Sequence, residues 1–400
     1  MKNFRVAIAG GGVGGLTAAL SLARIGCEVT LYEQAPEFSE VGAGLQLAPN
    51  CTRVLHHLGL EEALRGVAFL PQATQFRDWR SGRVIAETPL GEDVQKKHGG
   101  PYYHIHRGDL LRILVEAAES TKKISLQTGV RVEHFCETEA GVQLSVNGLD
   151  CEADLLVGAD GIHSVVRAGL WGERRPRFTG NVAWRALVPA DCLPDGLIKP
   201  MSTVWWGPGK HFVNYYLRRG ELVNCVCVVE KEGWEVESWT ERGDYDELRA
   251  DFAGWHDDVQ QLIEQVDRDS LFKWALYDRA PLEAWGRGRV TLLGDACHPT
   301  LPFMAQGAAM AIEDAAVLAS CLAAGHEISA SLARYEDLRR RRTAWIQNSS
   351  RRNAEVYHMS GIQTWFRNKV ARIAGQRTMD ELFSYNALDA EPASGTVNRL

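Results

Sequence analysis

Residues 4–33 read FRVAIAGGGVGGLTAALSLARIGCEVTLYE, and this stretch determines the fold expected for the chain. Residues 4–9 are apolar except for Arg5 and predict a short buried strand, whereas residues 16–26 have helical spacing. Residues 28–33 predict a second strand. Two strands joined by a helix within about 30 residues form a βαβ unit, which is typical of a parallel sheet. The expected fold class is therefore α/β with a Rossmann-like beginning.

The glycines between the first strand and the helix have the spacing Gly10-x-Gly12-x-x-Gly15. The first permits a tight turn, the second lets the backbone approach a pyrophosphate, and the third allows close packing of helix on strand. Glu33 ends the second strand, where a carboxylate can accept a hydrogen bond from a ribose 2′-hydroxyl. The segment therefore predicts a dinucleotide site. An acidic residue disfavours NADP there and leaves FAD and NAD open.

Two later segments also place an aspartate directly after an apolar strand. These are Asp160 in GADG (158–161) and Asp295 in GDA (294–296). Ligands of open α/β sheets bind at the carboxyl ends of the strands, so both aspartates are expected at the same edge. A helix beginning near Gly307 and Ala308 would direct backbone N–H groups there, which suits negative charge on a reduced flavin ring.

Composition narrows the class of protein. The 400 residues are 45% hydrophobic and carry a formal net charge of −7, which fits a soluble globular protein and argues against nucleic acid as a partner. The apolar stretch 6–23 is interrupted by glycines, so it predicts neither a membrane span nor an export signal. Nine scattered cysteines without a C-x-x-C pair indicate reduced thiols. A cytoplasmic location is expected.

The order of the segments predicts domains that are interleaved along the chain. Residues 178–280 alternate aromatic and β-branched residues, which predicts an antiparallel sheet with one face open to a ligand or a further layer. The fold expected is thus a mixed α/β and α+β chain with a substrate sheet inserted in a Rossmann-like domain. The predicted parts are FAD-binding segments 1–75, 101–177 and 281–345, a substrate hairpin 76–100, the substrate sheet 178–280 and a helical C-terminus with a mobile tail, 346–400.

Together the three segments resemble the flavoprotein aromatic hydroxylases, whose fold is that of p-hydroxybenzoate hydroxylase, over roughly residues 4–345. The resemblance implies non-covalently bound FAD and transient binding of NADH or NADPH. It also implies that O₂ forms a flavin C4a-hydroperoxide, which hydroxylates a phenolic aromatic acid. The cofactor supplies the difficult chemistry, while the protein positions the ring and deprotonates it.

Four stretches narrow the resemblance: VGAGLQLAPN, GGPYYHIHRGDL, LVGADGIHSVVR and LLGDACHPTLPFMAQGAAMAIEDAA. They are similar to salicylate 1-hydroxylase, 3-hydroxybenzoate 6-hydroxylase and 6-hydroxynicotinate 3-monooxygenase. The hydroxynicotinate enzyme has histidine where this chain has Gln46 and Phe303, and the 3-hydroxybenzoate enzyme has glutamine at Pro302. These departures favour a salicylate- or hydroxybenzoate-like acid. A hydroxylated N-heteroaromatic acid, a flavin dehydrogenase or oxidase, and a non-catalytic flavin-bound regulator remain as alternatives.

The resemblance also implies which residues form the site. His211 matches a pocket histidine, and an imidazole with a pKa of about 6.5 suits proton transfer. Tyr215 lies four residues on, hence on the same face of a strand, and Tyr102 matches a further pocket tyrosine. Arg107 matches an arginine that contacts FAD. The residues predicted to bind the cofactor are Gly10, Gly12, Val13, Gly14, Gly15, Glu33, Gln34, Gln46, Arg107, Val132, Asp160, Asp295, Pro299, Gly307 and Ala308.

Two patterns suggest other functions and are set aside. His104 and His106 would share one face of a strand, but no further ligands stand at metal spacing, so no metal centre is expected. The arginine run 339–342 lies on a helix around which the charges are spread, which predicts a solvated or intersubunit helix. A homodimer is left open.

Overall fold

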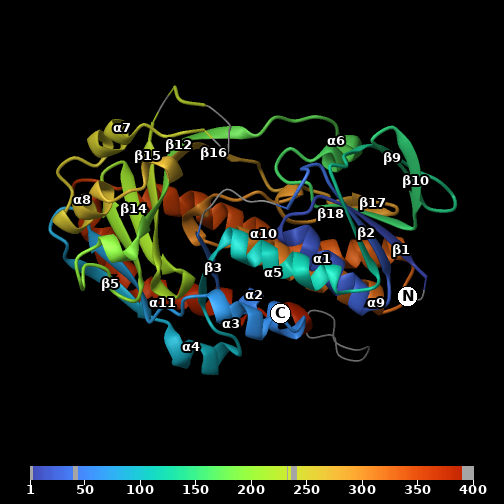
Figure 1. Cartoon of the computed structure of the whole chain (residues 1–400), viewed down its shortest axis with the longest axis horizontal. Coiled ribbons are helices and arrows are strands. Elements are labelled where there is room, and N and C mark those ends of the chain that lie inside the picture. Colours follow the sequence, from blue (N-terminus) through green and yellow to red (C-terminus); the bar gives the residue numbers. More distant parts are fainter. Residues whose placement is uncertain (1–2, 39–43, 232, 236–240, 390–400) are drawn as a thin grey trace.

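The computed structural model describes residues 3–38, 44–231, 233–235 and 241–389. Two large sheets lie at opposite ends of the long axis of the molecule (Figure 1). The first has the order β17–β18–β11–β1–β2–β7 and is parallel except at β17. Its strands are β1 (Arg5–Ala9), β2 (Glu28–Glu33), β7 (Ile124–Thr128), β11 (Leu155–Gly158), β17 (Gly286–Arg287) and β18 (Val290–Leu292).

The predicted βαβ opening is confirmed. Helix α1 (Val13–Arg24) follows β1 and leads into β2, and its residues Leu16 and Ala19 are fully buried. Helices α1, α5 (Arg107–Glu119) and α9 (Gly307–Ala323) contribute buried residues to the same core as β1 and β2. Helices α2 (Pro49–His57), α3 (Glu61–Val67), α6 (Val165–Trp171) and α10 (Ile328–Tyr357) also contribute to this core, whereas Val94 of α4 (Gly91–His98) belongs to a smaller cluster.

The second sheet has seven strands in the order β16–β12–β15–β14–β13–β4–β5. It is antiparallel as predicted except where β13 pairs in parallel with β4, which joins the hairpin β4–β5 to the edge of the sheet. The strands are β4 (Ala73–Asp78), β5 (Val84–Pro89), β12 (Arg177–Pro189), β13 (Ser202–Gly207), β14 (Lys210–Leu217), β15 (Leu222–Glu230) and β16 (Phe272–Asp278).

The two faces of this sheet have different neighbours. Phe212 of β14 packs with Phe252 and Leu262, beside the short helices α7 (Tyr245–Asp251) and α8 (Asp257–Glu264). His211 and Val213 point the other way because side chains alternate along a strand, and they line a cavity. The cavity is closed from the opposite side by the end of α10 and by α11 (Gln363–Ser384). One face of the sheet is therefore available to a ligand.

Two smaller sheets complete the described part of the fold. Strands β8 (Val132–Glu137), β9 (Val142–Val146) and β10 (Leu149–Ala153) form an antiparallel sheet beside the first one. Residues 44–47, for which the sequence analysis predicts no strand, form β3 (Gly44–Leu47), which pairs antiparallel with β6 (Tyr103–His106). The partner strand lies almost 60 residues away, so no local pattern could reveal the pairing. Residues 42, 43 and the tail 390–400 lie outside the described residues.

The two large sheets draw on alternating stretches of the chain, which confirms the mixed α/β class. The division into six consecutive parts stays a prediction. Among the described helices, none is both long and apolar enough to cross a membrane.

Candidate active site

The glycine loop combines two structural glycines with one that faces open space. Gly10 has a φ of +104°, and a Cβ there would lie 2.4 Å from the carbonyl oxygen of Ala159. A Cβ on Gly15 would lie 2.0 Å from the carbonyl oxygen of Gly10, so only glycine permits this contact of helix with strand. A Cβ on Gly12 would meet nothing within 4 Å. Gly12 is the N-cap of α1, and the space above it suits a phosphate.

A cavity of about 280 Å³ lies beside this loop. Glu33 lies in its wall, and its carboxylate accepts hydrogen bonds from the backbone N–H groups of Gly11 (2.7 Å) and Ala35 (2.8 Å). Each oxygen keeps a lone pair for a further donor, as binding of a ribose hydroxyl requires. Six predicted cofactor residues line the cavity: Gly10, Gly12, Glu33, Gln34, Val132 and Asp160.

Asp160 connects this cavity to the middle segment. One carboxylate oxygen accepts hydrogen bonds from the backbone N–H groups of Val165 (2.7 Å) and Val166 (3.2 Å) at the start of α6. The other oxygen is buried and accepts no hydrogen bond from the described residues. Arg167 then joins the middle segment to the third one, because it donates to the carbonyl of Ala296 at 2.7 Å. An unpaired buried acceptor at a cavity wall fits a bound hydroxyl or amide donor.

The third segment presents one polar side chain to solvent. Between Thr291 and Pro299, Asp295 is exposed while its neighbours are buried. The first turn of α9, which follows, holds Gly307 and Ala308 and no acidic residue, so its N–H groups can stabilise an anion. Gly14 lies against this region, since a Cβ there would lie 2.8 Å from Leu293.

The remaining predicted cofactor residues are placed as follows. Val13 is buried as the first residue of α1, and Pro299 is buried with its carbonyl accepting a 2.9 Å hydrogen bond from Gln347. Arg107 is half-buried at the start of α5. Together with the open glycine, the Glu33 carboxylate and the unpaired Asp160 oxygen, these positions are compatible with bound FAD.

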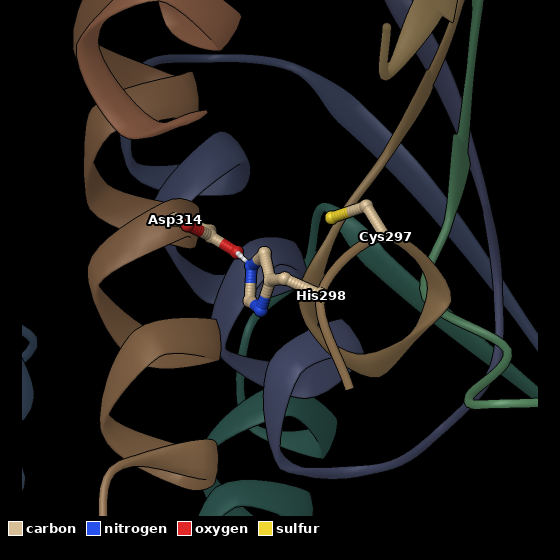
Figure 2. Close-up of side chains that lie close together, drawn as sticks. All are labelled: Cys297, His298 and Asp314. Carbon is tan, nitrogen blue, oxygen red and sulfur yellow. Dashed lines mark hydrogen bonds and ion pairs between the residues drawn. The ribbon is translucent and has the colours of Figure 1, made fainter. Parts of the chain in front are cut away.

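A buried ionic network holds the third segment in place. His298 Nε2 lies 2.5 Å from Asp314 on α9, and the same carboxylate accepts from the backbone N–H of Gly294 at 3.1 Å (Figure 2). Arg339 of α10 donates to Asp314 at 2.7 Å and pairs with Glu313 at 2.6 Å. The network therefore holds the loop 294–298 against α9 and joins α9 to α10.

Cys297, His298 and Asp314 lie close enough together to suggest a metal site (Figure 2). Their hydrogen bonds favour the network instead. Burial raises the pKa of the Cys297 thiol well above its usual range, and the thiol donates to the carbonyl of Gly294 at 3.3 Å. A metal would need the thiolate. The ring nitrogen of His298 and the carboxylate of Asp314, which would be the other two ligands, are hydrogen-bonded to each other instead.

This network corrects the expectation for the arginine run 339–342. Arg339 is 0% exposed, and Arg342 makes two hydrogen bonds to Glu313 at 2.9 and 2.8 Å. The prediction of a solvated or intersubunit helix was wrong for these two residues. Their carboxylate partners lie on α9, more than 20 residues earlier, so the pairing is not visible in the run itself.

A larger cavity of about 730 Å³ lies between the seven-stranded sheet and the C-terminal helices. The segment from Pro302 to Gln306, directly before α9, forms one end of it. Of the predicted site residues, His211, Tyr102 and Gln46 line this cavity. Tyr102 donates to Gln46 at 2.8 Å, and Gln46 donates to the Ser202 hydroxyl at 3.1 Å. These bonds fix the orientation of the Gln46 amide.

His211 is 3% exposed and lies in the wall of the cavity. Its Nδ1 lies 2.8 Å from Nε2 of His358, and its Nε2 has no hydrogen bond with a described residue. Burial, together with the neighbouring His358, lowers the pKa of His211 well below its usual range. The imidazole is therefore neutral at neutral pH and can accept a proton.

Tyr215 lies on the same face of β14 but is not part of the cavity lining. Its ring centroid lies 4.5 Å from that of His104, and a Cβ on Gly44 would meet its hydroxyl at 2.6 Å. The β3–β6 pair therefore covers Tyr215. A catalytic role for this tyrosine stays a prediction.

The sequence analysis missed one charged residue of this cavity, Arg367. The buried guanidinium of Arg367, from α11, lies 4.8 Å from the ring centre of Trp206 and donates to the Tyr357 carbonyl at 3.2 Å. Burial lowers the pKa of Arg367 to about 10, so it stays charged at neutral pH. Among the described residues it has no ion pair with a carboxylate. No local signal in TWFRNKV distinguishes this arginine.

Comparison with known proteins agrees with this site. The FAD binding domain family matches residues 3–350. The chain is 43% identical to the 3-amino-4-hydroxybenzoate 2-monooxygenase PtnB3 of Streptomyces platensis, over 89% of each chain. It is 38% identical to 6-hydroxynicotinate 3-monooxygenase of Pseudomonas fluorescens, over 91% of this chain and 92% of the relative.

A solved structure shows the same fold. Klebsiella pneumoniae HpxO, crystallised with FAD and uric acid, is 28% identical, with a TM-score of 0.85 over 97% of each chain. The glycine loop, the two aspartate segments and these similarities agree, and the chain belongs to the FAD binding domain family of FAD-dependent aromatic monooxygenases.

Proposed function

We propose that this enzyme hydroxylates a phenolic aromatic acid of the salicylate or hydroxybenzoate class, with NADH or NADPH and O₂ as co-substrates. The proposal is supported mainly by the larger cavity, whose otherwise largely apolar lining contains a neutral His211 from β14 and a charged Arg367 from α11. A phenolic acid carries the two complementary groups, a hydroxyl that can lose a proton and a carboxylate that can pair with a cation.

FAD, when bound, supplies the transfer of electrons from NAD(P)H and the activation of O₂. The residues of this chain bind and prepare the aromatic ring. Nε2 of His211 accepts the phenolic proton, which makes the ring more electron-rich and easier to hydroxylate. Arg367 pairs with the carboxylate, while Phe76 and Val204 exclude water from the ring. Gln46 and Tyr102 supply a polar edge beside the segment that precedes α9.

A panel of aromatic acids under ¹⁸O₂ tests the proposal. Salicylate, 3-hydroxybenzoate, 3-amino-4-hydroxybenzoate and 6-hydroxynicotinate are each added to the holoenzyme with NADH or NADPH. We expect at least one benzoate to accelerate NAD(P)H oxidation and to gain one ¹⁸O atom, read by product mass. Turnover of 6-hydroxynicotinate alone would establish the heteroaromatic alternative, which the 38% identity to the Pseudomonas enzyme supports. A product without ¹⁸O would instead indicate a dehydrogenase or oxidase.

Arg367→Gln is expected to raise KM for the acid by about 10- to 100-fold, because a hydrogen bond to a charged group contributes roughly 1.5–3 kcal/mol. The measurement is steady-state turnover with the acid and with its neutral amide, alongside FAD content. Arg352→Gln is the matched control, since Arg352 lines the same cavity but is exposed. An equal rise in KM for acid and amide would contradict carboxylate pairing by Arg367.

A further inference from the structure

A continuous line of hydrogen-bonding groups leads from the cavity to the protein surface. His211 Nδ1 lies 2.8 Å from His358 Nε2, and His358 Nδ1 lies 2.8 Å from Glu230 Oε1. His211 and His358 are buried, whereas the Glu230 side chain is 56% exposed. Glu230 opens into a polar surface recess that is separate from the large cavity. These hydrogen-bonded groups therefore connect the buried ring of His211 to solvent at the recess around Glu230.

The carboxylate at the end sets the tautomer of both histidines. Ionised Glu230 can only accept, so it binds the proton on Nδ1 of His358. Nε2 of His358 is then unprotonated and accepts from Nδ1 of His211. This leaves Nε2 of His211 without a proton, on a ring that lines the cavity. Each group is thus oriented to take a proton on its cavity side and release one on its surface side.

The surroundings of His211 do not stabilise the protonated form of its imidazole. The rings of Phe303 and Tyr357 lie 5.2 and 5.3 Å from its ring, and no described carboxylate is within ion-pair distance. Burial lowers the pKa of both His211 and His358, with Glu230 opposing the shift at His358. A proton accepted from a substrate is therefore stable only if it moves on to the surface.

The surface recess around Glu230 can receive that proton. It is lined by the cations Arg177, Lys231 and Arg351 and by the carboxylates of Asp278 and Glu355. Arg351 and Arg177 share the carboxylate of Asp278 at 2.5 and 3.3 Å, so only one of their two positive charges is compensated by this pairing. Glu230 is left as the carboxylate in contact with the histidine pair.

We propose that His358 and Glu230 form a proton relay that carries the phenolic proton of the substrate from His211 to solvent. The relay rests on the proposed function. The phenol O–H bond breaks as Nε2 of His211 gains the proton. Nδ1 of His211 gives its proton to Nε2 of His358, and Nδ1 of His358 gives its proton to Glu230, which releases it to water. One proton enters and one leaves, and no electron is transferred.

Stopped-flow spectroscopy of the holoenzyme tests the relay with 4-hydroxy-3-nitrobenzoate, a phenolic acid whose phenolate is yellow. A pH dye in weak buffer reports the released proton. In the wild type, phenolate and free proton should appear together. Glu230→Gln and His358→Gln should slow both by about tenfold or more, with FAD content unchanged. Added imidazole buffer should restore part of the rate in Glu230→Gln, an effect that a structural defect would not produce.

Glu355→Gln is the matched control, because Glu355 lies in the same recess and is exposed, without a hydrogen bond to either histidine. Wild-type rates in both Glu230→Gln and His358→Gln would overturn the relay and would indicate that His211 releases the proton into the cavity. If the wild type forms no phenolate, the proposed function fails for this acid.

The relay is then tested without ligand by the ¹⁵N signals of labelled histidines. Glu230→Ala removes the acceptor for Nδ1–H of His358, so we expect this variant to change the tautomer signals of His211, two hydrogen bonds away. Unchanged His211 signals would reject the relay.

Discussion

His211→Ala will lower turnover by about 10²–10⁴-fold with FAD still bound, which is the usual contribution of a general base. The imidazole lies in the cavity wall with one nitrogen unused, and its contacts are Phe303, Tyr357 and His358 rather than any part of the glycine loop. The loss should therefore fall on proton transfer and spare the cofactor. Turnover per bound flavin, with FAD content measured from its absorbance, checks this result.

His326→Ala is the control for this variant, because His326 is exposed in the turn between α9 and α10. It should retain wild-type turnover. Loss of flavin in His211→Ala with turnover per bound flavin intact would contradict the assignment and make the histidine a structural residue.

Gly12→Val should weaken FAD binding by about a hundredfold or more, equivalent to roughly 2.8 kcal/mol, while the apoprotein stays folded. A side chain at Gly12 meets no protein atom within 4 Å, and its backbone (φ −74°, ψ −176°) suits any residue. The valine would instead occupy the space that a pyrophosphate needs above α1. FAD titration of the apoprotein and thermal unfolding separate the two effects.

Gly66→Val serves as the matched control, since Gly66 is exposed in α3 and a Cβ there also meets nothing within 4 Å. This variant should bind FAD normally. Unfolding of Gly12→Val apoprotein, or wild-type FAD affinity, would show that the space above Gly12 has no role in binding. Gly15→Val is expected to fail for a different reason, the clash with the carbonyl of Gly10.

The cofactor end of the site was predictable because its geometry is local. A strand, a tight glycine turn and a helix follow one another without interruption, so the positions of Gly10, Gly12 and Glu33 depend on neighbouring residues. Asp160 and Asp295 follow parallel strands β11 and β18, and the direction of the strands alone brings them to one edge. His211 and Tyr102, predicted to belong to one pocket, both line the larger cavity, and their catalytic roles stay predictions.

The substrate end was predictable only in part. The alternation along β14 put Tyr215 on the face of His211, but the β3–β6 pair covers that stretch of the strand. Arg367 and His358 come from the last helices, which carry no chemical motif. Their charge and tautomer depend on burial and on partners more than 100 residues away in the chain.

The sequence by itself therefore determined the class of fold, the cofactor and the gathering of the glycine loop, Asp160 and Asp295 at one edge of the sheet. Those features follow from backbone rules that act within a few turns or along one strand. Only the tertiary structure decided which side chains line the larger cavity, that Arg367 has no ion pair with a carboxylate among the described residues, and which carboxylate is hydrogen-bonded to the histidine pair. These properties arise where the sheet meets α10 and α11, because burial and hydrogen-bond partners there are set by packing between distant segments.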